Sequence, residues 1–413
     1  MSTTDFFKNA RALNRLHQGP LGIHIDDFAS LLRGQGYAKG SAVGMLRIVA
    51  DFSHWLAIHH LDAHDVDSTR IRRFLARRKR TRGVGRSDRG ALRKLLVFLH
   101  AKGVVTLNIE EVPKSQIEQL KEEFGRYLVQ GRGLSPATRR IYLPVISHFL
   151  TERFADGTCP LEALAAADII GFVARHARRQ SHSKAQLLVT ALRTFLRYLL
   201  HNGKIATDLA ACVPTVAKWS HAELPKFLTP DQVNQVLNHC DRKTDAGRRD
   251  YAILLLLARL GLRAGEVAAL TLNQINWEQG YMTIRAKGGR WTQLPLLADV
   301  GEAIAQYLIS GHATCNDRHV FIRTHAPRRG FATSTAISGL VKRAFVRAGL
   351  ALPCNGAHLL RHSLATQMLR QGGSLFDIGQ VLRHRQLDTT RIYAKVDLCA
   401  LRTLVLPWPG ENQ

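Results

Sequence analysis

The sequence predicts a mainly α-helical protein, with two helical bundles in its N-terminal half and a small antiparallel β-sheet in its C-terminal half. Three observations support this prediction. Apolar residues recur at helical spacing through most of the chain, glycines stand where these segments should end, and two short strand-like segments flank a glycine turn. At 413 residues the chain is long enough for two or three domains, each with its own core.

The composition indicates a globular protein with a polyanionic partner. The chain is 46% hydrophobic, and 58 Lys and Arg residues against 32 Asp and Glu leave a formal charge of +26. Nucleic acid is the commonest partner of such a chain, while association with a ribosome or with an anionic membrane surface is the alternative. No apolar run approaches the ~20 residues that span a bilayer. The first residues lack an apolar signal region, so we expect a cytoplasmic protein and no membrane partner.

The six cysteines are scattered and form no Cys-x-x-Cys pair. This spacing argues against both a zinc site and a disulfide framework, and it suits a reducing cytoplasm.

An internal repeat divides the N-terminal half. Residues 34–41 resemble residues 131–138, and a phenylalanine follows eleven residues after each segment. Residues 91–103 and 191–203 both begin with Ala-Leu-Arg and end with glycine. We interpret this as two tandem bundles of about four short helices each, because two copies are too few for a solenoid. The alternative is that any two amphipathic helical bundles look alike.

A dense basic cluster lies in the first bundle. Twelve Lys and Arg residues but only one acid, Asp88, fall between Arg70 and Lys94. The pattern predicts a basic helix, a loop and a second basic helix that contact phosphates, although a charge run is often only a solvated face. The candidate nucleic-acid contacts, which include weaker ones in the second bundle, are Arg72, Arg73, Arg77, Arg78, Lys79, Arg80, Arg139, Arg140, Arg178 and Arg179.

The C-terminal half begins after a linker at about residues 206–225. Residues Thr229 to Gln232 predict a helix start with a capping box and proline at the first helical position. An apolar stretch at about 250–260 predicts a buried helix. Residues 281–286 and 291–296 alternate around Lys-Gly-Gly-Arg and predict a β-hairpin, and the remainder to residue 405 is helical in character.

The last third also holds residues suited to attack on a phosphodiester without a metal. Arginine forks bind non-bridging oxygens bidentately, and a phenol can be the nucleophile if cations favour its ionised form. Each residue alone has an ordinary structural explanation, so the argument rests on their joint occurrence. The candidate catalytic residues are Arg263, Lys287, His358, Arg361, His384 and Tyr393, with Glu266 placed to orient Arg263.

His362 follows His358 by four residues, a spacing that also permits a two-histidine zinc site. No Glu follows His358 as a base and no third ligand is evident, so we interpret His362 as a packed structural histidine. We predict no metal and no cofactor.

The order and spacing of these residues closely resemble the tyrosine recombinase family, also called phage-type integrases. The resemblance covers about residues 118–405 and is most specific over 261–266 and 358–393. It implies an extra helical DNA-binding domain at 1–108, a core-binding domain of SAM-like type at 109–215, and a catalytic domain with a C-terminal tail at 216–413.

The resemblance also implies roles. Arg263 and Arg361 would clamp the scissile phosphate, and Tyr393 would attack it to leave a 3′-phosphotyrosine. Lys287 would protonate the departing 5′-oxygen, His358 would be acid or base for the tyrosine, and His384 would bond the phosphate.

Two positions depart from the family pattern. Leu359 stands where an acidic residue is common, which we expect to be tolerated because that side chain has no assigned chemistry. Arg383 replaces the usual glycine, adds a cation near the site and could change the loop geometry.

The implied function is site-specific recombination of double-stranded DNA, for integration, excision or transposition of a mobile element. A homodimer or homotetramer on DNA is expected, or a hetero-oligomer with related recombinases, as for transposase-like members encoded in trios, at the cytoplasmic nucleoid. Two rivals remain: a type IB topoisomerase-like enzyme and a non-catalytic accessory subunit. An apolar stripe after Tyr393, at Leu398, Leu401, Leu404 and Val405, is expected to dock on a neighbouring subunit or on its own domain.

Overall fold

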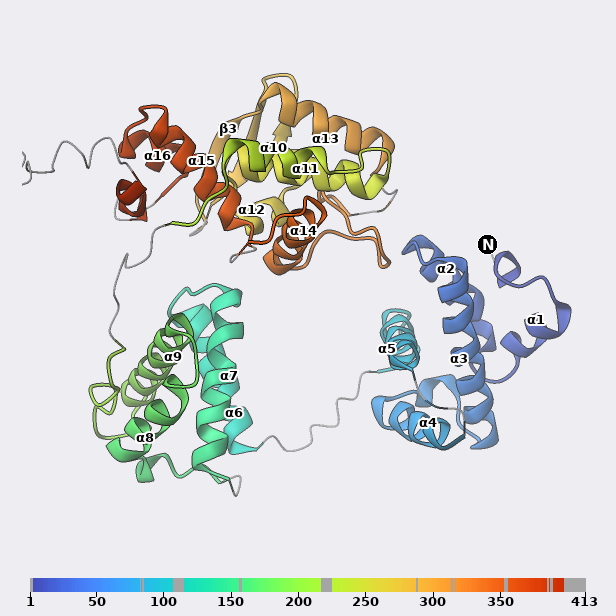
Figure 1. Ribbon diagram of the computed structural model, residues 1–413. Coiled ribbons are helices and arrows are strands. Elements are labelled where there is room, and N and C mark those ends of the chain that lie inside the picture. Colours follow the sequence, from blue (N-terminus) through green and yellow to red (C-terminus); the bar gives the residue numbers. More distant parts are fainter. Residues whose placement is uncertain are drawn as a thin grey trace, which may run out of the picture. The chain divides into compact units, whose positions relative to one another are not determined.

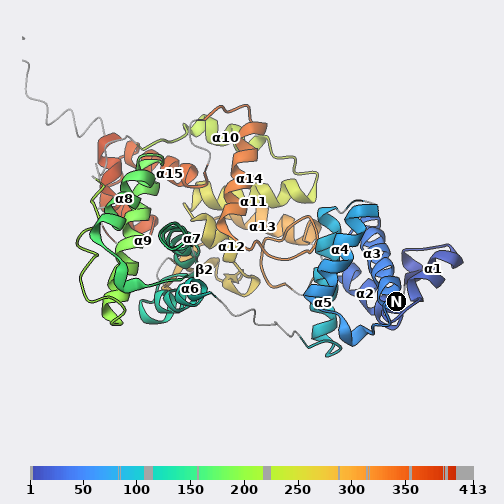
Figure 2. The same ribbon diagram turned by 90° about the horizontal axis from the view of Figure 1, so that it is seen from below.

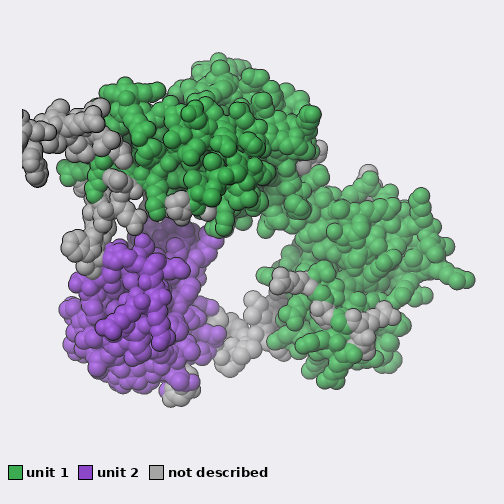
Figure 3. Space-filling view, viewed as in Figure 1, with its two compact units in different colours: residues 1–107, 223–413 green, residues 108–222 purple. Residues whose placement is uncertain are grey.

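The structure is a computed structural model in which helices predominate and a three-stranded antiparallel sheet lies in the C-terminal half of the chain (Figure 1). This architecture confirms the predicted fold class. The chain divides into two compact units, residues 1–107 with 223–413 and residues 108–222 (Figure 3). The three-domain division with boundaries at 108 and 215 stays a prediction. The residues that the structure describes are 3–81, 83, 85–106, 115–155, 158–216, 225–286, 289–312, 315, 317–352, 356–384, 386 and 389–396.

The N-terminal helices of the first unit pack around the long helix α3, which contacts α1, α2 and α5. Phe28 and Phe52 are fully buried in their core. The α-helices are α1 (Ala10–His17), α2 (Ile25–Gly34), α3 (Lys39–Ile58), α4 (Ser68–Thr81) and α5 (Arg86–Ala101). The short 3-10 helices are η1 (Thr3–Asp5), η2 (Gly22–His24) and η3 (Ala63–Asp65).

The second unit is a helical bundle in which α7 and α8 both pack against α9. Helix α7 begins with a capped first turn, in which Ser135 Oγ accepts a hydrogen bond from Thr138 N and proline occupies the first helical position. The α-helices are α6 (Gln116–Arg126), α7 (Pro136–Arg153), α8 (Ala166–Ala177) and α9 (His182–His201). A π-helical turn and a 3-10 helix accompany them, η4 (Tyr127–Gly131) and η5 (Leu161–Ala163).

The two bundles use matching helix pairs. In the first bundle the packed pairs are α2–α3, α3–α5 and α4–α5. The corresponding pairs in the second bundle are α6–α7, α7–α9 and α8–α9. The repeated glycines share left-handed backbone, with φ of 74° at Gly36, 60° at Gly133, 71° at Gly103 and 64° at Gly203. The predicted pair of helical bundles is therefore confirmed, and their origin by duplication stays a prediction.

The C-terminal helices surround α11, the most deeply buried of them (Figures 1 and 2). It packs against α10, α12, α13 and α15, so few of its side chains face solvent and the prediction of a buried helix is confirmed. The helices are α10 (Pro230–Asn238), α11 (Asp245–Arg259), α12 (Ala264–Ala269), α13 (Ala298–Ser310), α14 (Ser334–Arg347), α15 (His358–Arg370) and α16 (Leu375–Val381), with 3-10 helices η6 (Leu272–Gln274) and η8 (Arg391–Val396).

Two local predictions for this part of the chain are confirmed. Thr229 Oγ1 accepts from Gln232 N, and Gln232 Oε1 accepts from Thr229 N, which forms the capping box of α10. The predicted hairpin pairs β2 (Tyr281–Arg285) with β3 (Trp291–Pro295), in a register that places Met282 opposite Leu294. A two-residue strand, β1 (Ile275–Asn276), extends the sheet and was too short to predict from the sequence.

No helix among the described residues is long and apolar enough to cross a membrane.

The core of the second unit generates a stability prediction. Phe195 is fully buried and its ring centroid lies 5.1 Å from that of Phe124, so Phe195→Ala should lower the free energy of unfolding by about 3–5 kcal/mol. The control is Ile170→Ala on the same bundle, where the side chain is 46% exposed and the loss should stay below ~1 kcal/mol. Urea denaturation followed by far-ultraviolet circular dichroism measures both, and equal losses would contradict the assigned core.

Candidate active site

Arg263 stands at the start of α12, four residues after the buried helix α11 ends. Gly261 permits this turn with φ of 57°, in the left-handed region that favours glycine. The position is also crowded, because a β-carbon at Gly261 would lie 2.7 Å from Leu382 Cδ2 and 3.1 Å from Leu364 Cδ2. The glycine therefore lets the α11–α12 turn approach the segments that carry the other candidate residues.

Glu266 joins two arginines beneath this turn. Its carboxylate accepts hydrogen bonds of 2.9 Å from both the backbone nitrogen and Nη1 of Arg263. Its Oε2 also accepts from Arg383 Nη2 at 3.1 Å. The Glu266 side chain is only 4% exposed. A buried carboxylate with this many donors holds both guanidinium groups in defined orientations, which is the geometry needed for Glu266 to orient Arg263.

Arg361 lies on α15 and is buried, with 6% of its surface exposed. Its Nη1 donates to the carbonyl of Gly261 and its Nη2 to the carbonyl of Leu382. Burial, followed by the nearby charges of Arg263 and Arg383, lowers the pKa of Arg361 to about 9. The group remains a cation at neutral pH, and a guanidinium has five N–H donors, so two carbonyl contacts leave capacity for a phosphate.

Arg383 departs from the family pattern but keeps the backbone shape that a glycine would adopt. Its φ is 54°, which is uncommon for a residue with a side chain. The expected extra cation is present near the site, where it is 5% exposed and paired with Glu266. Burial lowers the pKa of Arg383, and the Glu266 carboxylate opposes that shift. Leu359, the other departure, is a core residue at 2% exposure, consistent with its expected tolerance.

Tyr393 is buried at 1% exposure, and its hydroxyl lies 2.8 Å from Nδ1 of His362. His362 is packed among other side chains, as interpreted from the sequence, and its ring also contacts the candidate nucleophile, which the sequence did not predict. Thirty-one residues separate the two, so local spacing carried no signal for the contact. Burial, then His358 and Arg361, lowers the pKa of His362 to about 4, so the ring is neutral at pH 7, and an unprotonated Nδ1 accepts a hydrogen bond from the phenolic hydroxyl.

The expected activation of the phenol by cations is outweighed here. Burial raises the pKa of Tyr393 to about 12, although Arg361 and Arg263 both act to lower it. The sequence could not show how deeply the phenol lies. In this conformation Tyr393 is protonated and withdrawn from solvent.

Of the other two histidines, His384 lies beside the same tyrosine and His358 lies beside His362. His384 Nδ1 lies 2.7 Å from Thr390 Oγ1, and the His384 and Tyr393 rings are nearly parallel with centroids 6.5 Å apart. Burial, then Arg361 and Arg263, lowers the pKa of His384 to about 4. His358 is the exposed first residue of α15, and its ring meets that of His362 edge to face at 5.7 Å.

The structure thus brings Arg263, Glu266, Arg361, His384 and Tyr393 together, with His358 at the edge of the cluster. Lys287 lies outside the described residues, as does the stripe from Leu398 to Val405. The strands β2 and β3 that flank Lys287 are described.

The candidate DNA contacts differ in their surroundings. Arg78 forms ion pairs with Asp51 at 2.7 Å and Asp88 at 3.5 Å. Its guanidinium therefore holds these segments of the bundle together, a role that competes with the expected contact to a phosphate. The remaining nine are exposed. They are Arg72, Arg73, Arg77, Lys79 and Arg80 on α4, Arg139 and Arg140 on α7, Arg178 at the end of α8 and Arg179 after it.

Known proteins match both halves of the chain. Residues 226–398 match the model of the phage integrase family, and residues 122–203 match that of the phage integrase N-terminal SAM-like domain. The protein y4rA of Sinorhizobium fredii, named as an integrase/recombinase, is 44% identical over 99% of this chain and 100% of its own length. Tyrosine recombinase XerD of Listeria monocytogenes is 30% identical over 69% of this chain and 97% of its own.

Solved structures share the fold. XerH site-specific recombinase bound to palindromic difH substrate has a TM-score of 0.55 at 20% identity, covering 81% of this chain and 93% of that one. A lambda integrase dimer bound to a COC' core site has a TM-score of 0.51 at 18% identity, covering 67% of this chain and 94% of that one.

The buried histidine generates a pH prediction. Because the pKa of His362 falls from 6.5 in the unfolded chain to about 4 in the folded one, acid favours the unfolded state. The contribution of the neutral His362 imidazole to the free energy of unfolding is complete above pH 6.5 and is lost as the pH falls towards 4. Between pH 7 and pH 4, wild type should lose roughly 3 kcal/mol more stability than His362→Asn.

Urea titrations at a series of pH values measure this difference. The control is His239→Asn, an exposed histidine, which should follow the wild-type pH curve. Parallel curves for wild type and His362→Asn would contradict the buried neutral imidazole.

Proposed function

The chain belongs to the phage integrase family of tyrosine recombinases, and we propose that it cleaves and rejoins double-stranded DNA at specific sites through a 3′-phosphotyrosine. The observation that carries the proposal is the convergence of the Tyr393 hydroxyl with the guanidinium groups of Arg361 and Arg263, both close enough to influence the pKa of the phenol. A phosphate placed among these groups would meet a nucleophile and two charge-stabilising forks together. The topoisomerase and accessory-subunit alternatives are not favoured.

The chemistry follows from these groups. The Tyr393 oxygen attacks phosphorus, the bond from phosphorus to the 5′-oxygen breaks, and Arg263 and Arg361 stabilise the charge on the non-bridging oxygens. Lys287 protonates the departing 5′-oxygen, the role that the family resemblance implies. The phosphotyrosine bond retains the energy of the original ester, so attack by a partner strand's 5′-hydroxyl reverses the step and completes strand exchange.

The histidines have distinct tasks in this proposal. A Thr390 hydroxyl that donates to His384 Nδ1 leaves the proton on Nε2, which makes the neutral ring a donor to a phosphate oxygen. His362 is a positioning residue that holds the Tyr393 hydroxyl. His358 lies beside His362 and accepts the phenolic proton once the phosphate is bound, because a pKa of about 4 makes His362 a weak base.

Assembly on DNA is part of the same proposal. The matched structures of XerH and lambda integrase hold DNA, and the latter is a dimer. The relative y4rA matches this chain over nearly its full length, which includes the basic helices α4 and α5. We therefore propose that α4 and α5 contact DNA phosphates within an oligomer of the recombinase. In this proposal the oligomer acts on a mobile element at the nucleoid, and its subunits are copies of this chain or related recombinases.

Covalent capture tests the chemistry. On nicked suicide DNA that carries the ends of the encoding element, with EDTA present, wild type should form an adduct that survives denaturant and maps to Tyr393. Tyr393→Phe should bind the DNA without an adduct, while Arg361→Lys should form it roughly 10²–10³-fold more slowly because a transition-state donor is displaced. The control is Tyr281→Phe in β2, which should react as wild type. An adduct in Tyr393→Phe would place the nucleophile elsewhere.

The basic helix makes a separate prediction about affinity. Replacing the exposed Arg73, Arg77 and Arg80 with alanine should reduce the slope of log affinity against log salt by about 0.9 for each phosphate contact removed. Arg78→Ala is the matched control on the same helix, because its ion pairs predict lost stability with little change in slope. Fluorescence anisotropy at several salt concentrations measures the slope, and an unchanged slope in the triple variant would show that α4 does not contact DNA.

A further inference from the structure

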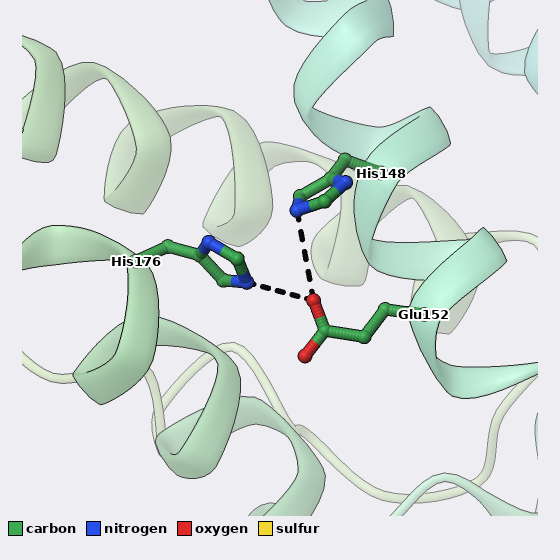
Figure 4. A group of neighbouring side chains, drawn as sticks. All are labelled: His148, Glu152 and His176. Carbon is green, nitrogen blue, oxygen red and sulfur yellow. Dashed lines mark hydrogen bonds and ion pairs between the residues drawn. The ribbon is translucent and has the colours of Figure 1, made fainter. Parts of the chain in front are cut away.

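Two histidines and a glutamate that have no role in the proposed chemistry converge on the second unit. His148 and Glu152 are one turn apart on α7, and His176 is near the end of α8 (Figure 4). Their ligand atoms all lie within 4.8 Å of one another. We propose that these three side chains bind a divalent first-row transition-metal ion, with zinc as the reference ion, and that the ion ties α7 to α8.

The distances are close to those of such a site. Glu152 Oε2 lies 2.7 Å from His176 Nε2 and 3.6 Å from His148 Nε2. Zinc bonds of about 2.0–2.1 Å in tetrahedral geometry separate neighbouring ligand atoms by roughly 3.4 Å. Small side-chain rotations, without backbone movement, therefore bring the three atoms onto one ion.

The glutamate is already oriented for this task. Both Nε and Nη2 of Arg175 donate to Glu152 Oε1, at 3.0 and 2.6 Å. This contact leaves Oε2 facing the two imidazoles, as Figure 4 shows for the three side chains. A partner that fixes a ligating carboxylate is a regular feature of protein metal sites.

The histidines are held from below by an apolar ring. Phe172 is buried at 1% exposure, and its centroid lies 4.5 Å from that of His176 and 5.7 Å from that of His148. The two imidazoles meet edge to face at 4.6 Å. The His148 side chain is 58% exposed, so the site opens to solvent and water can complete the coordination of an ion.

The donor set selects the class of metal. Two imidazoles and one carboxylate suit Zn²⁺, Co²⁺, Ni²⁺ and Cu²⁺, whereas Mg²⁺ and Ca²⁺ prefer oxygen ligands alone. The prediction of no metal came from scattered cysteines and from His358 with His362, and it did not consider ligands on two different helices.

The ion would act on the region where DNA contacts are proposed. Arg175, which orients Glu152, precedes Arg178 and Arg179 by a single turn. An ion that binds only the folded bundle stabilises it by mass action, so α8 and its basic end become more rigid when the metal is present.

Isothermal titration of the EDTA-treated, dialysed full chain with ZnCl₂ tests the site. Wild type should show a saturable one-to-one event that His148→Ala, His176→Ala and Glu152→Gln each weaken at least ~10-fold. His182→Ala, at the exposed start of α9, is the matched control and should retain wild-type affinity. MgCl₂ should give no event at this site. Equal affinity in wild type and His176→Ala, or no saturable event in wild type, would overturn the proposal.

Hydrogen exchange gives a second, independent readout. Zinc should slow exchange in peptides from α7 and α8 of wild type and should leave the same peptides unchanged in His176→Ala. Unchanged exchange in wild type at saturating zinc would refute the link between the two helices, even if zinc bound elsewhere on the chain.

Discussion

The buried guanidinium of Arg361 is the interaction on which the arrangement of the candidate site depends. Its two carbonyl partners, Gly261 and Leu382, are 100 and 21 residues away in sequence. A buried cation must have its donors satisfied, and here the α11–α12 turn and the end of α16 supply the two carbonyl acceptors. The same contacts place the segments that carry Arg263 and Arg383 beside each other. The arrangement of guanidinium groups that we propose for phosphate binding therefore depends on how these segments pack.

Glu266 allows three arginines to share so small a space. Arg263, Arg361 and Arg383 would repel one another without a counter-charge, and the Glu266 carboxylate contacts two of them directly. Arg383 reaches Glu266 from a left-handed backbone position that glycine would occupy more easily. Arginine at position 383 thus preserves the turn and brings a second guanidinium to the Glu266 carboxylate. The ion pair between Arg383 and Glu266 anchors the loop just before His384.

The burial of Tyr393 places the site in a resting condition. Desolvation outweighs the field of two arginines on the pKa of the phenol, and His362 is too weak a base to remove its proton. A bound phosphate would supply the charge that the two arginines are arranged to meet. In the mechanism that we propose, Tyr393 therefore reacts only after a bound phosphate has changed the surroundings of its hydroxyl.

The sequence by itself determined the local elements and the identity of the chemical groups. Capping residues began α7 and α10, glycines with left-handed backbone ended repeated helices, and the order of arginines, histidines and tyrosine indicated the family. These signals act over a few residues, so they can be read along the chain. Only the tertiary structure decided the bond from His362 to Tyr393, the pairing of Arg383 with Glu266, and the meeting of His148 and His176. Each joins segments 24 or more residues apart or on different helices, and such contacts arise from the packing of whole helices around a shared core, which no local pattern records.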